Sequence, residues 1–115
     1  MTTLLALLLL WTPATAPLDR AIVHVESRGN EWAISPAGAR GRWQVMPAVA
    51  RVHPWLLHVP AIGRAEGRRV LGRWLARCQR RGHGMRCALR AYACGTAGLR
   101  GGCDWYAERV LTEVR

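Results

Sequence analysis

The sequence predicts a small domain that is mainly α-helical. Three observations indicate this fold class: apolar residues recur at helical spacing in several segments, clusters of glycine and proline separate those segments, and no segment shows the sustained apolar–polar alternation of a strand. The chain has 115 residues, which suits one compact domain. A core of that size is small, so covalent staples would help to stabilise it.

Four helices are expected from the apolar spacing and from signals at their ends. In the first helix the apolar residues share one face, and Asp19 stands near the positive end of the helix dipole. The longest helix carries an apolar stripe that includes Trp74, and Asp104 is positioned to cap the last helix. The expected helices are residues 18–27, 66–80, 86–94 and 104–114.

The segments between these helices are expected to be irregular or to hold only short helices. A helix is expected to begin near Arg42, and Pro47 favours another start because proline suits the first turn of a helix. Elsewhere proline and glycine predict loops. The predicted irregular segments are residues 31–41, 53–60 and 95–102.

The chain is strongly basic. It has 17 basic and 7 acidic residues and a formal net charge of +10, and all 17 basic residues are arginine. A surface of this kind attracts polyanions by long-range steering. Nucleic acid, an anionic membrane and the anionic bacterial wall all fit this description, and charge alone does not choose among them.

Residues 1–16 are typical of a secretory signal peptide. Residues 4–11 form an unbroken apolar run, which is followed by the small-x-small pattern Ala14-Thr15-Ala16. Cleavage after Ala16 would leave residues 17–115 as the functional domain. The run is too short to cross a bilayer, which needs about 20 apolar residues. The alternative is an ordinary N-terminal helix packed on the domain.

Four cysteines agree with export, because an even number in a short exported chain suggests disulfides. Cys87 and Cys94 are expected on one helix, roughly 10 Å apart along its axis, which is too far for a bridge between them. Pairing of Cys78 with Cys87 and of Cys94 with Cys103 is preferred, since it would staple neighbouring helices. Pairing of Cys78 with Cys103, or a crossed set, is the alternative. No zinc site is expected, because the sequence has no C-x-x-C pair.

Glu26 stands out among the seven carboxylates of the chain. It lies four residues after Ile22, next to the apolar stripe of the first expected helix. Burial of a carboxyl group against apolar side chains raises its pKa, and a general acid that works near neutral pH needs a raised pKa. Position alone does not distinguish this hypothesis from an exposed glutamate at a helix end.

The stretch that follows Glu26 contains several motifs in a fixed order. Glu26-Ser27 is followed by Asn30, by Ser-Pro-Ala-Gly-Ala at residues 35–39, by Gly-Arg-Trp-Gln at residues 41–44 and by Met-Pro at residues 46–47. Over about twenty residues and without a gap, this order resembles the core of the soluble lytic transglycosylase (SLT) family. The resemblance implies a lysozyme-like fold, so the predicted class is a small, mainly α, lysozyme-like SLT domain.

A second resemblance lies further along the chain. Residues 91–95, which contain Tyr92, resemble the family's Ala-Tyr-Asn-x-Gly motif, and residues 106–111 resemble its Tyr-x-x-x-Val segment. Together the matching segments cover residues 18–111. One departure is clear: the asparagine that follows the tyrosine in the family is Ala93 here.

The resemblance implies a role for each matching residue. Glu26 would be the catalytic residue, acting first as acid and then as base, and Tyr92 would hydrogen-bond and position it. Ser27 and Gln44 would line the substrate cleft near the scissile bond. For Trp43, lining the cleft and packing in the core are both open. No cofactor and no metal are implied.

The other tryptophans are assigned from their positions. Trp74 is expected in the core because it lies on the stripe of the longest helix. Trp32, Trp55 and Trp105 are candidates for stacking on sugar faces, with a structural role as the alternative for each.

The expected function follows from these resemblances. The chain would be a monomeric lytic transglycosylase, exported to the periplasm or the extracellular space, that cleaves the glycan strands of peptidoglycan. Its size suits local opening of the wall for a secretion, conjugation or phage apparatus. A nucleic-acid partner is not expected, because it would explain the charge but not the motifs. The alternatives are a lysozyme-like hydrolase and a wall-binding protein that has lost activity, the latter motivated by Ala93.

Overall fold

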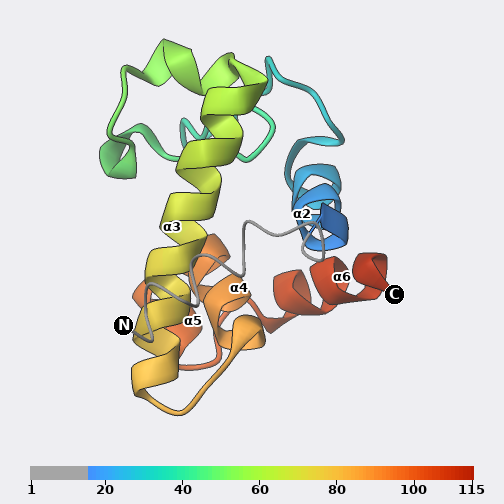
Figure 1. Ribbon diagram of the computed structural model, residues 1–115, viewed down its shortest axis with the longest axis vertical. Helices are drawn as coiled ribbons and strands as arrows, with labels where there is room; N and C mark the ends of the chain where they lie inside the picture. The colour runs from blue at the N-terminus through green and yellow to red at the C-terminus, as the bar shows by residue number, and fades with distance from the viewer. Residues whose placement is uncertain (1–15) are drawn as a thin grey trace. The chain divides into compact units, whose positions relative to one another are not determined.

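The computed structural model describes residues 16–115 (Figure 1). Helices dominate this part of the chain, and its β-type pairings are isolated bridges between Ile34 and Arg40 and between Arg40 and Val45. The mainly α class is therefore confirmed. The helices are α2 (Ala16–Ser27), α3 (Pro60–Arg80), α4 (Met85–Cys94), α5 (Thr96–Leu99) and α6 (Asp104–Val114), with 3-10 helices η2 (Pro47–Val49) and η3 (Pro54–His58).

Three of the four predicted helices are confirmed within one or two residues, and the fourth begins earlier than expected. Helix α3 begins at Pro60 and not at residue 66, because proline suits the first turn and Gly63 is tolerated inside the helix. The helix expected near Arg42 is wrong, since residues 41–44 form a turn. Helices η3 and α5 occupy two segments that were expected to be irregular.

The chain divides into two compact units, and helices α2 and α3 each contribute residues to both. Of the described residues, one unit combines residues 16–21 with Val70–Arg115, and we call it the helical unit. The other is Ile22–Arg69, and we call it the loop unit.

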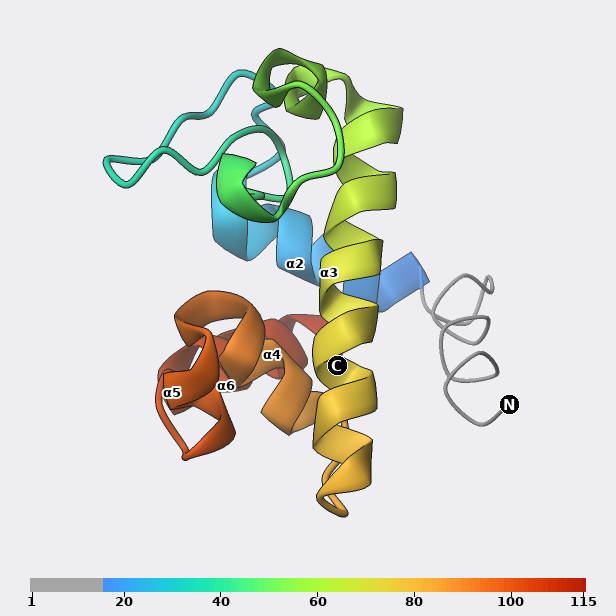
Figure 2. The ribbon, with the colours of Figure 1, turned by 90° about the vertical axis from the view of Figure 1, so that its left-hand side faces the viewer.

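In the helical unit, α4 packs against both α5 and α6 (Figure 2). Glycine makes the first of these contacts close: a Cβ atom at Gly98 would overlap the backbone of Arg90 and Ala91. The buried side chains of this unit include Leu71, Leu75, Cys78, Cys87, Leu89, Tyr106 and Val110. A small apolar core therefore holds three short helices and the end of α3 together.

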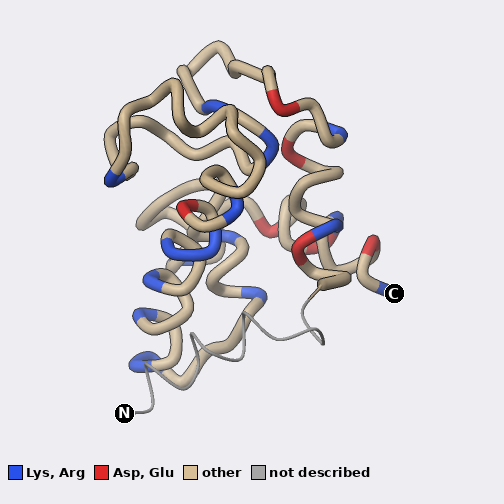
Figure 3. The backbone as a smooth tube through the Cα atoms, turned by 45° about the horizontal axis from the view of Figure 1, so that its top comes forward, with Lys and Arg blue, Asp and Glu red and all other residues tan. Residues whose placement is uncertain are grey.

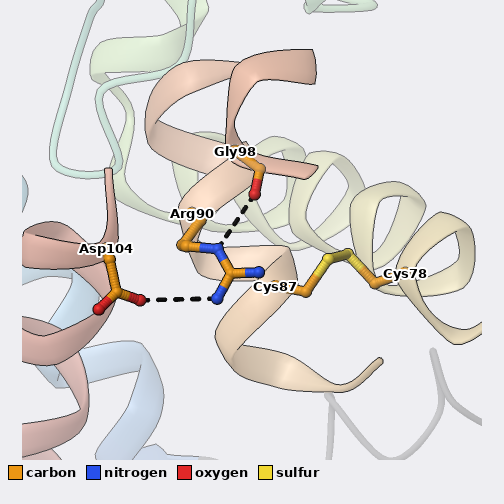
Figure 4. The surroundings of a disulfide bond; sticks show 5 residues. All are labelled: Cys78, Cys87, Arg90, Gly98 and Asp104. Atoms are coloured by element: carbon orange, nitrogen blue, oxygen red, sulfur yellow. Dashed lines mark hydrogen bonds and ion pairs between the residues drawn. A yellow bond between two sulfur atoms is a disulfide. The ribbon is translucent and has the colours of Figure 1, made fainter. Parts of the chain in front are cut away.

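Arginines of α4 connect that helix to the start of α6. The guanidinium of Arg86 donates two hydrogen bonds to the carboxylate of Asp104, at 2.9 and 2.7 Å, and pairs with Glu108 at 2.9 Å. The hydrogen bonds from Arg86 lower the pKa of the Asp104 carboxyl group. Arg90 donates to the carbonyl oxygen of Gly98 at 3.0 Å and lies 3.5 Å from Asp104 (Figure 4). Asp104 is thus occupied by arginines and does not cap α6, whose N-cap residue makes no side-chain capping bond.

Two disulfides staple the helical unit, and their pairing is the one that the sequence favoured. Cys78 at the end of α3 pairs with Cys87 in α4 (Figure 4), and Cys94 at the end of α4 pairs with Cys103 just before α6. The Cα–Cα distance is 6.0 Å in each pair. The first bridge therefore joins α3 to α4, and the second joins the end of α4 to the start of α6 across α5.

The predicted signal peptide lies almost entirely outside the described residues, which begin at Ala16. It stays a prediction. Among residues 16–115, none of the helices combines the length and the apolar character that a membrane crossing requires.

Removal of either disulfide is expected to destabilise the fold. Each bridge closes a loop of about ten residues, and chain entropy assigns such a loop roughly 3 kcal/mol of unfolding free energy. The double variants Cys78→Ser/Cys87→Ser and Cys94→Ser/Cys103→Ser should each unfold at lower urea concentration, and the loss should be larger for the first pair because both of its cysteines are buried. Dithiothreitol should destabilise the wild type but leave the four-serine variant unchanged. Equal urea midpoints for the wild type and both double variants would contradict this assignment.

Candidate active site

The end of α2 is fixed by the side chain that follows Glu26. The Ser27 hydroxyl lies 3.1 Å from the carbonyl oxygen of Val23, one turn back, and 2.8 Å from the carbonyl oxygen of Arg42. It also accepts a hydrogen bond from the backbone N–H of Gly29 at 3.2 Å. The helix stops here because the next two residues have positive φ, +54° at Arg28 and +81° at Gly29. Ser27 therefore ties the last turn of α2, which carries Glu26, to the loop around Arg42.

The Ser-Pro-Ala-Gly-Ala motif forms a closed turn in that loop. Ser35 donates its backbone N–H to the carbonyl oxygen of Ala39 at 2.9 Å, and its hydroxyl accepts from the Ala39 N–H at 3.0 Å. Arg40 and Val45 then exchange two backbone hydrogen bonds of 3.0 and 3.1 Å. The motif thus folds residues 34–45 back on themselves.

The Gln44 side chain connects the start of this loop, at Ala33, to its turn at Gly41. Its side-chain amide donates to the carbonyl oxygens of Ala33 at 3.2 Å and Gly41 at 2.8 Å. Its backbone has a positive φ of +49°, which is uncommon outside glycine. The hydrogen bonds to two carbonyls fix the residue in this conformation, so Gln44 has a structural role that the sequence did not reveal. Its predicted contact with substrate stays a prediction.

Trp43 lies in the core of the loop unit, with only 2% of its surface exposed. Its indole lies close to α3 at Gly67, where a Cβ atom would come within 2.5 Å of the ring. A Cβ atom at Gly41 would overlap the carbonyl group of Leu57 in the same way. Of the two alternatives for Trp43, its burial supports core packing and leaves little indole surface for a substrate.

Glu66 is a buried carboxylate whose role the sequence did not predict. It accepts hydrogen bonds from the backbone N–H of Arg51 at 2.6 Å and from the guanidinium of Arg69 at 3.2 Å. Arg69 also donates to the carbonyl oxygen of Val49. The hydrogen bond from Arg69 lowers the pKa of Glu66 and outweighs the opposing effect of burial. Glu66, together with Arg69, thus connects α3 to residues 49–51 through charged hydrogen bonds. The three-residue spacing of Glu66 and Arg69 in a helix was the signal that could have predicted the ion pair.

Two further carboxylates, Glu26 and Glu31, belong to the loop unit. Glu26 is half-buried in the last turn of α2. Glu31 follows in the loop, and its carbonyl oxygen accepts a hydrogen bond from His58 Nδ1 at 2.8 Å. Positive charge, by contrast, recurs at successive turns of α3 (Figure 3). Within residues 16–115, no group of histidine, cysteine and carboxylate side chains is arranged to hold a metal ion.

The predicted site residues fall in both units. Glu26, Ser27, Trp43 and Gln44 belong to the loop unit, and hydrogen bonds connect the α2 end to the Gly41–Gln44 turn. Tyr92 lies half-buried on α4 in the helical unit. The predicted hydrogen bond between Tyr92 and Glu26 would join the two units, and it stays a prediction.

Comparison with known families agrees with this arrangement. The model of the transglycosylase SLT domain matches residues 15–102, which is most of the chain. The protein therefore belongs to the SLT domain family and has its mainly helical, lysozyme-like fold. Comparison with curated proteins and with solved structures gives no significant match. Family membership supports a transglycosylase-type function on peptidoglycan, which lies outside the cytoplasm, and the two disulfides fit an exported protein.

Replacement of Glu66 by glutamine is expected to destabilise the protein in a pH-dependent way. At neutral pH the unfolding free energy should fall by about 2 kcal/mol, because the three hydrogen bonds that Glu66 accepts are made to a buried charge and are weakened in the amide. The folded-state pKa of Glu66 lies below its ordinary value of 4.5. Its stabilising effect is therefore complete above pH 4.5 and is lost as the pH falls through the lower, folded-state pKa. Urea unfolding at several pH values should show the wild type and Glu66→Gln converging below pH 4.5.

Glu31→Gln is a suitable control for this measurement, because its carboxylate has no partner comparable to Arg69 among residues 16–115. It should leave the urea midpoint nearly unchanged at every pH. A stability difference between wild type and Glu66→Gln that stays constant from pH 7 to below pH 4 would contradict the lowered pKa.

Replacement of Gly67 by alanine is expected to destabilise the loop unit even though alanine favours helices. The added methyl group would press on the Trp43 indole, and overpacking of this kind costs typically about 1–3 kcal/mol. Gly84→Ala is the control for an added methyl group without a clash, because its Cβ atom would meet nothing within 4 Å; as the N-cap residue of α4 it lies just outside a helix, where alanine replaces glycine at a small cost. Thermal unfolding should show a lower midpoint for Gly67→Ala alone; a raised midpoint would mean that the helix propensity of alanine outweighs the contact.

Proposed function

We propose that this protein is an exported lytic transglycosylase that cleaves the β-1,4 bond between MurNAc and GlcNAc in peptidoglycan. The observation that carries the proposal is the end of α2. There Glu26 lies half-buried, and Ser27 connects its helix turn to the loop that holds the Gly-x-x-Gln motif of an SLT domain. A general acid needs a fixed position near the bond that it protonates.

The proposed reaction uses one carboxyl group twice. The protonated Glu26 gives its proton to the glycosidic oxygen, and the bond between that oxygen and C1 of MurNAc breaks. The resulting Glu26 carboxylate then removes the proton from the C6 hydroxyl of the same sugar, and O6 forms a bond to C1. The products are a free GlcNAc end and a 1,6-anhydroMurNAc end. Glu26 returns to its protonated form, and no water is consumed.

The state of Glu66 supports this one-acid scheme. A glycosidase that uses two carboxylates needs the second one near the scissile bond, as nucleophile or base. The Glu66 carboxylate is engaged by Arg69 and by the backbone of Arg51. Glu31, the remaining acid of the loop unit, has no counterpart in the family motifs. In the proposed scheme Tyr92 positions Glu26, and Ser27 and Gln44 keep the loop beside it.

Glu26→Gln is expected to abolish cleavage of purified peptidoglycan. Loss of the acid should lower the rate at least about a hundredfold, because glutamine has no proton to transfer in this step. Glu31→Gln is the matched control and should retain activity. Mass spectrometry of the wild-type products should show 1,6-anhydroMurNAc ends.

Other outcomes would exclude the proposal. Products with reducing MurNAc ends, which form when water attacks C1, would make the protein a lysozyme-like hydrolase. Binding to peptidoglycan without any cleavage by the wild type would make it a wall-binding protein of this fold. Equal cleavage by the wild type and Glu26→Gln would remove Glu26 from its role.

A further inference from the structure

Two exposed tryptophans lie close together on the loop unit. Trp32 follows the Glu26 motif, and Trp55 belongs to η3, far along the chain. Their exposed fractions are 67% and 60%. Burial of the two indoles by a ligand would be favourable by about 25 cal/mol for each Å² of apolar surface removed from water. Such a pair is therefore a candidate binding surface.

His58 holds the two indoles together. Its ring is stacked on Trp32, with centroids 5.6 Å apart, and lies 5.4 Å from the ring of Trp55. Only 3% of its surface is exposed, and its Nδ1 atom is fixed by the carbonyl oxygen of Glu31 at 2.8 Å. The indoles therefore have a rigid base, and little conformational entropy is lost when a ligand binds to them.

Arg40 completes the cluster and brings a positive charge to it. Its guanidinium lies over the Trp55 ring, 4.9 Å from the centroid, and its backbone is fixed by pairing with Val45. The Arg40 side chain is half-exposed, so its positive charge lies beside the exposed Trp55 indole.

We propose that Trp32, Trp55, His58 and Arg40 form an accessory subsite for one sugar ring of a GlcNAc-containing glycan. This inference rests on the proposed function, because it assigns the subsite to the strand that Glu26 cuts. A pyranose ring has an apolar C–H face that fits an exposed indole such as Trp32 or Trp55. The carboxylates of peptidoglycan add a partner for Arg40.

The charge beside the indoles argues against a purely apolar partner. An apolar protein surface would cover the indoles but would also remove water from the half-exposed Arg40 side chain without supplying an anion. A peptidoglycan strand supplies both an apolar ring face and carboxylates. The cluster also belongs to the unit that contains Glu26, so a strand bound at the subsite would be held by the same body as the proposed acid.

The test uses chitotetraose, a soluble chain of four GlcNAc rings, and the full chain carrying Glu26→Gln to prevent turnover. The indole N–H signals of Trp32 and Trp55 should shift in NMR spectra as the sugar is added, and that of the half-buried Trp74 should not. Trp32→Ala and Trp55→Ala should each weaken binding roughly fivefold, the loss expected for one ring contact. The corresponding phenylalanine variants assign the signals and should retain most of the affinity.

Trp105→Ala is the matched control. Trp105 is 62% exposed, which is close to the exposed fractions of Trp32 and Trp55, but it lies on α6 in the helical unit. The Trp105→Ala variant should bind chitotetraose with the same affinity as the Glu26→Gln protein that retains all its tryptophans. The proposal is overturned if the Trp32 and Trp55 signals stay unmoved, or if their alanine variants bind as tightly as Trp105→Ala. It is also overturned if these variants lose only self-association, since the cluster would then be an interface between two copies.

The subsite and the proposed reaction can fail separately. Cleavage of peptidoglycan by the wild type, with unmoved Trp32 and Trp55 signals, would leave Glu26 in its role and remove the subsite. Shifted signals without any cleavage would keep the subsite and remove the catalytic proposal.

Discussion

The hydroxyl group of Ser27 connects three parts of the loop unit. It reaches back to the carbonyl oxygen of Val23, forward to the Gly29 N–H, and across to the carbonyl oxygen of Arg42. The first two contacts end α2 in a defined geometry, and the third holds the Gly41–Gln44 turn beside the helix. Gln44 then closes the loop by bonding to Ala33 and Gly41. The motif residues around Glu26 are therefore joined by hydrogen bonds from two side chains, those of Ser27 and Gln44.

In addition to these hydrogen bonds, close packing determines where the loop of residues 34–45 can lie. Trp43 rests on α3 because Gly67 has no side chain, and the loop passes the Leu57 carbonyl because Gly41 has none. Glu66 and Arg69 fix residues 49–51 from the other side. The proposed acid is consequently held by elements that are far apart in sequence but meet around a buried indole.

The helices were predictable where apolar spacing and end signals agreed, as in α2, α4 and α6. The start of α3 was misplaced because Pro60 and Gly63 usually mark a loop, whereas here proline begins the helix. Helices η3 and α5 span only five and four residues, too few for a helical period to be visible in the sequence. The motifs around Glu26 identified the family. They could not show that Trp43 is buried or that Gln44 bonds within the loop, because those facts depend on the approach of α3 and on a positive φ.

The order of the disulfides has a consequence for biogenesis. Each cysteine is paired with the next one along the chain, nine residues away. A polypeptide that enters an oxidising compartment N-terminus first presents both partners of the first bridge before either partner of the second. A thiol oxidase that joins cysteines in their order of arrival would therefore produce the native set directly. A chain with this order of pairing has little need for an enzyme that rearranges disulfides.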